Sequence, residues 1–364
     1  MASRKNTSKT YVDSIIWMNL LFVGLVLCLH SVNYTKDYLW EITHRFINPY
    51  EAGIDQILQK LAVGGFLFLS GYKLALSKKL EPTKAFLIGR LLRIYPLYFL
   101  AVIASTFTAY PYAFDLLPNS GNFVMHILAL QSWLPNFFQA NYLTIWFVSN
   151  LFFCYALFPI LRIPTKRSRL LLMLSLLTAG IYLARFACLA LFRVDFFPGD
   201  FDIYFLFFGF GMAFSVSSQQ DHKSFSNTKL AILVATLVAS MIAFIGLNLY
   251  LPKDAPTFFV LKRTVVFGFT LPAFIVMFSQ LSKVGISKQQ AYLLKYLNTA
   301  SFCVFLFHRP IWAVMSTLWN NPSYLQSVFI LGVGIPFIFV VSYQLQFFYA
   351  SRVFPYLKQI RSAK

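Results

Sequence analysis

The sequence predicts an all-α polytopic membrane protein. Of its 364 residues, 58% are hydrophobic and only 12% are charged, which is too apolar for a soluble chain of this length. Apolar runs long enough to cross a bilayer as helices recur along the whole chain. No small-residue cleavage site follows the first run, so we expect it to stay as a helix. We therefore expect residues 1–364 to form a single integral-membrane domain, with short cytoplasmic tails at 1–13 and 350–364.

About ten segments have the length and apolarity of transmembrane helices. A helix of about 20 apolar residues spans the hydrocarbon core. The predicted spans are about 14–33, 57–77, 86–109, 143–161, 170–191, 201–217, 229–250, 258–282, 294–318 and 325–349. Residues 123–134, "FVMHILALQSWL", are apolar but too short to cross, so we expect an interfacial or re-entrant piece.

The basic residues orient the predicted spans. With the N-terminus inside, most of the 31 Lys and Arg residues lie in inner segments, whereas residues 94–161 contain none. The positive-inside rule then places both termini in the cytoplasm. This distribution explains the net charge of +19 without a nucleic-acid partner, and no nucleic-acid-binding motif is present. The four cysteines fall inside apolar runs and are too widely spaced for a metal motif, so we expect no metal.

Polar side chains from four predicted spans fall at a similar depth. A rise of about 1.5 Å per residue places His30, Asn150, Arg185, His308 and Arg309 in the outer part of the membrane. Ionisable groups are expensive at that depth and usually face a cavity or a partner. A lone histidine in a span is more often a hydrogen-bonded packing residue, but the grouping favours a site.

A second polar layer lies at the inner surface. In "GRLLRIYPLYFL", residues 89–100, the spacing of Arg90 and Arg93 puts both guanidiniums on one helix face. Two such planar cations suit a phosphate-bearing ligand; anchors beside lipid head groups would look the same. The nearby lysines add to this charge: Lys73, Lys78, Lys79 and Lys84. Together the layers suit a phosphorylated carrier that docks from the cytosol and reaches inward to a base.

Five stretches in order resemble the integral-membrane acyltransferase type 3 family. They are "VGLVLCLHS", "GGFLFLSGYKL", "GRLLRIYPLYFL", "LALQSWLPN" with "IWFVSNLFFCYALFPIL", and "ASFCVFLFHRPIW". The third matches the Arg-x-x-Arg-x-x-Pro signature through Arg90, Arg93 and Pro96. Two positions differ from the family pattern: Asn19 stands where the family usually has Arg or Lys, and Asn150 where it often has Glu.

The resemblance implies a membrane O-acyltransferase. Members move an acyl group, often acetyl, from cytosolic acyl-CoA to a hydroxyl of an extracytoplasmic or lipid-linked carbohydrate, commonly in a bacterial inner membrane. His30 is then the expected general base. The expected donor-binding residues are Arg90, Arg93, Asn19 and Lys84. Candidates for stabilising the oxyanion are Arg185, Arg309 and Asn150.

Two alternatives remain open in the sequence. His308 either shares the base role or caps a carbonyl freed by Pro310, and the second, structural role is the more common one. The whole chain could also be a transporter or flippase of a lipid-linked sugar, because transporters too carry cationic patches and intramembrane histidines. Release of free CoA from an acyl-CoA donor separates the enzyme from the transporter.

Overall fold

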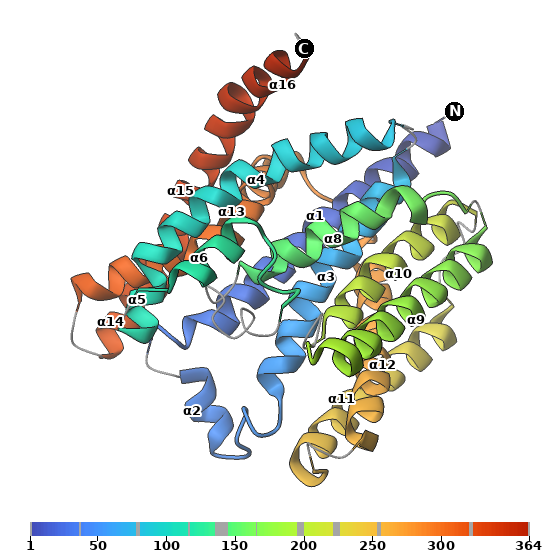
Figure 1. The fold of residues 1–364 in the computed structure, drawn as a ribbon, viewed down its shortest axis with the longest axis horizontal. Coiled ribbons are helices and arrows are strands. Elements are labelled where there is room, and N and C mark those ends of the chain that lie inside the picture. Colours follow the sequence, from blue (N-terminus) through green and yellow to red (C-terminus); the bar gives the residue numbers. More distant parts are fainter. Residues whose placement is uncertain are drawn as a thin grey trace. The chain divides into compact units, whose positions relative to one another are not determined.

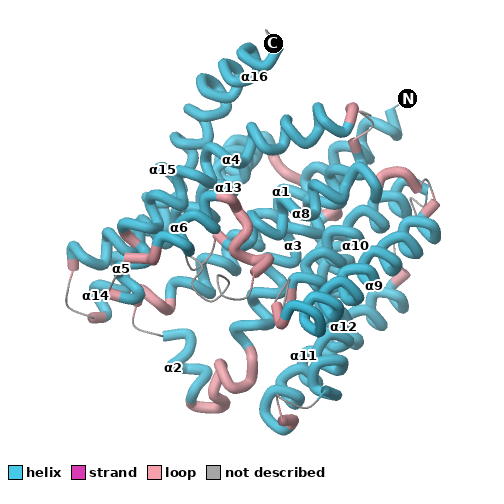
Figure 2. Tube along the Cα trace, viewed as in Figure 1, coloured by secondary structure: helices cyan, strands magenta, loops and turns pink. Residues whose placement is uncertain are grey.

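A computed structural model describes most of the chain as helices. The described residues are 2–35, 38–77, 81–115, 117–134, 145–164, 166–194, 200–220, 226–252, 256–319 and 323–362, and they contain no strand (Figure 2). The chain divides into two compact units, 1–69 with 221–298 and 70–220 with 299–364. Two of the three divisions fall within helices, α3 (Ile54–Leu76) and α13 (Lys288–Leu318), and the third follows residue 220.

The first unit is built around the N-terminal helix. Besides parts of α3 and α13 it contains α1 (Ala2–Ser31), α2 (Tyr38–His44), α11 (Asn227–Tyr250) and α12 (Pro256–Leu281). The ring of Phe22 on α1 packs edge-on against Phe66 and Phe274, with centroids 5.9 and 5.8 Å apart. Helices α11 and α12 pack side by side (Figure 1). A Cβ at Gly65 would lie 2.3 Å from Phe22, so the small residue lets α1 and α3 approach closely.

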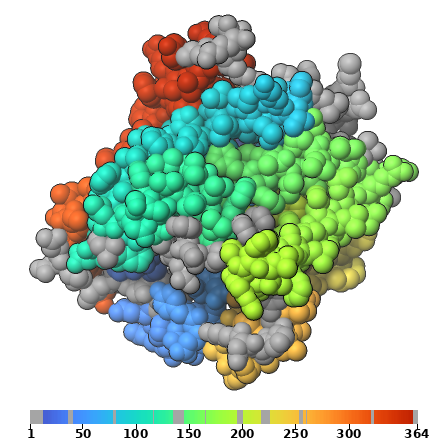
Figure 3. Space-filling view, in the orientation of Figure 1, coloured from blue at the N-terminus to red at the C-terminus, as the bar shows by residue number. Residues whose placement is uncertain are grey.

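The second unit holds the other helices. They are α4 (Thr83–Phe107), α5 (Ala109–Phe114), α6 (Ser120–Ile127), α8 (Trp146–Leu161), α9 (Arg167–Phe192), α10 (Phe201–Gln220), α14 (Tyr324–Val328), α15 (Gly334–Phe348) and α16 (Phe354–Ser362), with π-helical segments η1 (Phe329–Val333) and η2 (Tyr349–Val353). One face of this unit presents α4, α5, α6 and α8 (Figure 3).

Ring contacts give the directions of neighbouring helices in the second unit. Phe86 of α4 contacts Phe158 of α8, and Tyr98 further along α4 contacts Phe152, which comes earlier in α8. The two helices therefore run antiparallel. Antiparallel neighbours are what the alternating direction of consecutive membrane spans requires.

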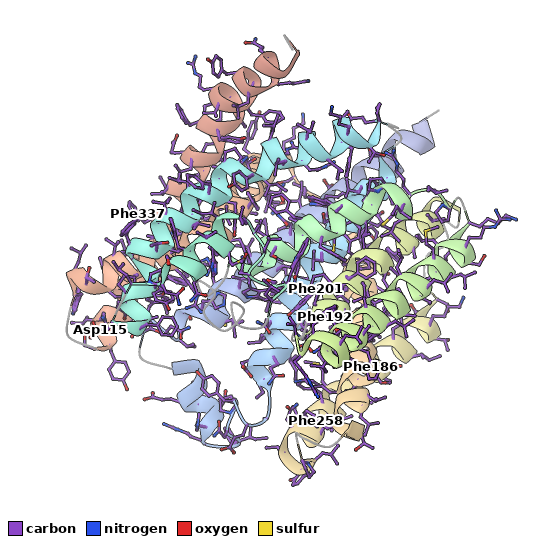
Figure 4. All side chains as sticks on the ribbon, in the orientation of Figure 1. Asp115, Phe186, Phe192, Phe201, Phe258 and Phe337 are labelled. Carbon is purple, nitrogen blue, oxygen red and sulfur yellow. The ribbon has the colours of Figure 1, made fainter. Side chains whose placement is uncertain are left out.

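The outer faces of several helices are apolar and exposed. On α9, Phe186 and Phe192 are 72% and 69% exposed, and both are labelled in Figure 4. Exposed apolar surface of this extent marks an interaction site for lipid or another protein. In a chain of this composition it is typical of contact with lipid acyl chains. The protein is an integral membrane protein.

The described helices agree with the predicted spans in position. Each of the ten predicted segments is helical over most of its length. Among the described residues, 7 helices are long and apolar enough to cross a membrane, while Trp146–Leu161 and Phe201–Val216 are shorter apolar helices. The count of ten spans and the cytoplasmic position of both termini therefore stay predictions. The segment 123–134 is a short helix, α6, followed by a turn, consistent with a piece too short to cross.

Candidate active site

Arg90 is held between two aromatic rings. Its guanidinium carbon lies 5.2 Å from the ring centroid of Phe86, one turn earlier on α4, and 5.5 Å from that of Tyr155 on α8. Cation–π contacts of this kind restrict where a guanidinium can lie. The Tyr155 hydroxyl in turn forms a 3.0 Å hydrogen bond with the Ser70 hydroxyl on α3. Three helices thus fix one cation.

The other predicted donor-site cations are more exposed. Arg93, one turn beyond Arg90, is exposed, as is Lys73 on α3, and the charges of Arg93 and Lys73 lie close enough to interact electrostatically. Lys84 is exposed in the first turn of α4, six residues before Arg90 and so about 9 Å away along the helix axis. The structure therefore groups Arg90, Arg93 and Lys73, with Lys84 further out.

Pro96 leaves a free acceptor on α4 to which the C-terminal part of the chain is hydrogen-bonded. Proline has no N–H, so it leaves the carbonyl oxygen four residues earlier without its helical partner. That carbonyl belongs to Leu92, and the hydroxyl of Tyr349 in η2 donates a hydrogen bond to it. The proline of the Arg-x-x-Arg-x-x-Pro motif thus creates an acceptor that a distant segment uses.

A second polar cluster lies where the turn after α6 meets α8. The Gln131 amide donates to the hydroxyl of Tyr98, 3.2 Å away, and to the carbonyl of Ile145, 3.4 Å away. The Ser132 hydroxyl donates to the carbonyl of Trp146 over 3.0 Å. Gln131 and Ser132 are both buried. This segment is therefore attached to α4 and to the first turn of α8 by side-chain hydrogen bonds.

Asn150, a predicted site residue, lies one turn into α8 beside this cluster. Asn150 and the preceding Ser149 are buried, 3% and 0% exposed. The Asn150 Oδ1, the Ser149 hydroxyl and the Gln131 Oε1 are buried atoms with no hydrogen-bond partner among the described residues. Leaving such atoms unsatisfied is costly, and native structures contain few of them.

His308 is buried in α13 and hydrogen-bonded to its own helix. Its Nδ1 lies 2.9 Å from the carbonyl oxygen of Val304 and 3.0 Å from that of Phe305. Since a carbonyl oxygen can only accept, the proton is on Nδ1 and the lone pair is on Nε2. Pro310 frees the carbonyl of Leu306, whereas these two bonds of His308 go to the carbonyls one and two residues before it. These bonds within the helix match a structural role for His308. A neutral imidazole that is protonated on Nδ1 is also the form that a base acting through Nε2 needs.

Arg185 and Arg309 are both on helices of the second unit. Arg309 is 7% exposed, and Arg185 is half-buried on α9. Three residues before Arg185, the Tyr182 hydroxyl donates to a carboxylate oxygen of Asp202, in the first turn of α10. Residues three apart share a helix face, so Arg185 lies on the side of α9 that packs against α10.

His30 and Asn19 belong to the first unit. His30 is half-buried in the last turn of α1. Asn19, three turns earlier and 9% exposed, donates from its amide to the Oδ1 of Asn298 on α13 over 2.8 Å. Asn19 therefore already has a buried polar partner. The predicted convergence of His30 with Asn150, Arg185, His308 and Arg309 joins residues of both units, and it stays a prediction.

The sequence alone does not single out Tyr155, Ser70, Gln131 or Ser149. Each is a common residue type inside an apolar helix or turn, and its contacts come from segments far away in the chain. The nearest signals were the "QSW" and "SN" stretches, which entered only through the family resemblance.

Comparison with known proteins supports the family resemblance that the arginine motif indicated. A family model described as an acyltransferase domain, that of acyltransferase type 3, matches residues 12–345. No curated protein and no solved structure gives a significant match to the chain. The match covers most of the sequence and includes every predicted site residue. The chain belongs to the acyltransferase type 3 family of membrane acyltransferases.

Proposed function

We propose that this protein transfers an acyl group, acetyl in the first instance, from cytosolic acyl-CoA to a hydroxyl of an extracytoplasmic or lipid-linked carbohydrate. The observation that carries the proposal is the guanidinium of Arg90, fixed by Phe86 and Tyr155, with Arg93 one turn away. A guanidinium presents a planar fork of N–H donors that matches phosphate oxygens. CoA carries phosphates at the end remote from its thioester, so this pair would hold the donor and direct its acyl end onward.

In the proposed reaction His30 is the general base. The imidazole removes the proton from the acceptor hydroxyl while that oxygen attacks the thioester carbon. The C–O bond forms, the C–S bond breaks, and the CoA thiolate leaves and takes up the proton that the imidazole had removed. A positioned base typically contributes about 10²–10⁴-fold to the rate. Asn150, Arg185 and Arg309 are the candidates for donating to the developing oxyanion.

The test measures thiol release by the detergent-purified protein. Wild-type protein is incubated with acetyl-CoA and a lipid-linked glycan extract. The release of free CoA and the acetylation of the glycan are both measured. His30→Ala should abolish both the release of free CoA and the acetylation of the glycan. Without the base, the hydroxyl must attack while it still holds its proton, and the activation barrier is higher. His44→Ala is the matched control: His44 is exposed at the end of α2, and its removal should leave turnover unchanged.

The outcomes separate the candidate functions. Turnover in wild type that vanishes only in His30→Ala supports the proposal. Equal turnover in wild type and His30→Ala shows that His30 is not the base, and His308 is then the next candidate. Movement of the glycan across a vesicle membrane without any thiol release is the transporter result. A bacterial inner membrane is the proposed location, and it is checked by fractionation of the producing cell.

A further inference from the structure

We propose that Gln131, Ser149 and Asn150 form the binding site for the acceptor, and that they recognise hydroxyl groups of a neutral carbohydrate. This inference deepens the proposed function. It depends on that function in one respect: the ligand is an acceptor only if the protein transfers an acyl group. The three residues contribute three buried polar atoms that have no partner among the described residues: Gln131 Oε1, Ser149 Oγ and Asn150 Oδ1.

The hydrogen bonds of Gln131 and Ser132 place the three residues on adjoining segments. Gln131 and Ser132 donate to the carbonyls of Ile145 and Trp146. In an α-helix the carbonyl of residue i points toward residue i+4, so these two oxygens point toward Ser149 and Asn150. The segment that carries Gln131 therefore lies alongside the turn of α8 that carries the other two residues.

The orientation of the Gln131 amide is fixed by its donors. Its Nε2 group donates to the Ile145 carbonyl oxygen and to the Tyr98 hydroxyl, 3.4 and 3.2 Å away. Reversing the amide would place Oε1 against a carbonyl oxygen, which cannot donate. Oε1 must then face away from Ile145, and it remains an acceptor in a residue that is 0% exposed.

The carbonyl that a helical serine at position 149 would normally bond is already occupied. A helical Ser or Thr usually donates to the carbonyl four residues earlier, as Thr106 does to Val102 over 2.7 Å. For Ser149 that carbonyl belongs to Ile145, whose oxygen already accepts from Val148 N at 3.1 Å and from Gln131 Nε2. A carbonyl oxygen has two lone pairs, and both are in use. The Ser149 hydroxyl is thereby kept for another partner.

The chemistry of the three atoms selects the ligand class. Two are amide oxygens that only accept, and the third is a hydroxyl that both donates and accepts. Hydroxyl groups of a sugar complement all three. The cluster itself is neutral, so an ionic ligand would be desolvated here at high cost.

The position of the cluster suits an acceptor. Asn150 and Tyr155 are five residues apart on α8, or about 8 Å along its axis. Tyr155 contacts Arg90, the centre of the proposed donor site. The predicted topology puts the Asn150 end of α8 toward the outer side, from which an extracytoplasmic carbohydrate arrives.

The decisive experiment measures equilibrium binding of radiolabelled octyl glucoside, galactoside, mannoside and N-acetylglucosaminide to detergent-purified wild type and Ser149→Ala. Removal of one hydrogen-bonding hydroxyl should weaken binding of the preferred glycoside at least fivefold. Ser342→Ala is the matched control, because Ser342 on α15 is also 0% exposed and its hydroxyl likewise has no partner among the described residues. Ser342→Ala should bind as wild type does.

Each result has a defined meaning. Both variants lose an unsatisfied hydroxyl, so both should melt no lower than wild type, and loss of binding then reflects the site and not misfolding. Equal glycoside binding by wild type and Ser149→Ala, or no glycoside binding by wild type, overturns the proposal and leaves buried water as the occupant of the cluster. Glycoside binding that depends on Ser149, without any thiol release from acetyl-CoA, would support this site while refuting the proposed acyl transfer.

Discussion

Replacing Tyr155 should weaken binding of the acyl-CoA donor through Arg90. The Tyr155 ring lies 5.5 Å from the Arg90 guanidinium, and its hydroxyl bonds to Ser70. A cation–π contact contributes about 0.5–1 kcal/mol at exposed sites and about 2 kcal/mol or more when desolvated. Arg90 is half-buried, so Tyr155→Leu should cost about 1 kcal/mol of donor affinity, or about fivefold. Phe86 remains as the second ring and limits the loss.

Tyr155→Phe separates the ring from the hydroxyl. It keeps the ring over Arg90 and removes only the bond to Ser70, which should lower the free energy of unfolding by about 1 kcal/mol and change donor affinity less than twofold. The assay is titration calorimetry with CoA, alongside thermal unfolding in detergent. Tyr343→Leu serves as the control, because the Tyr343 ring stacks on Phe347 of its own helix. The reasoning fails if Tyr155→Leu binds CoA as wild type does, or if Tyr155→Phe loses as much affinity as Tyr155→Leu.

Three further substitutions test the packing. In Gly71→Ala the new Cβ would lie 2.0 Å from the Phe208 carbonyl oxygen, so α3 and α10 must separate and the unfolding free energy should fall by about 1–3 kcal/mol. Gly180→Ala meets nothing within 4 Å and should gain about 0.5–1 kcal/mol; a thermal melt that ranks the two alike contradicts this. Asn19→Arg should destabilise the first unit, because it buries a charge and breaks the bond to Asn298. An unchanged melting temperature together with tighter CoA binding would show instead that the family's usual cation is tolerated there.

The helices could be predicted because each depends on local sequence. Apolar runs must satisfy their backbone hydrogen bonds internally when they enter a membrane, and a helix does this within one segment. The predicted spans therefore coincide with helices in the described chain. The close approach at Gly65 and Gly71 is possible because small residues let helix backbones come near each other.

The candidate site could be predicted only in part. The spacing of Arg90 and Arg93 on one helix face follows from helix geometry alone. The partners do not follow, because a side chain's contacts depend on how neighbouring helices are rotated and shifted along their axes. Tyr155 faces Arg90 only because α8 runs antiparallel to α4 in one particular register.

The sequence by itself determined that this chain is a helical membrane protein with a basic arginine pair and histidines in its apolar runs, because composition, hydrophobic length and motif spacing are local properties. Only the tertiary structure decided that Gln131 occupies the Ile145 carbonyl and leaves Ser149 without its usual helical acceptor. One lone pair of that carbonyl accepts from Val148 N, and Gln131, 14 residues before Ile145, competes with Ser149 for the other. Such competition exists only after the segments have packed.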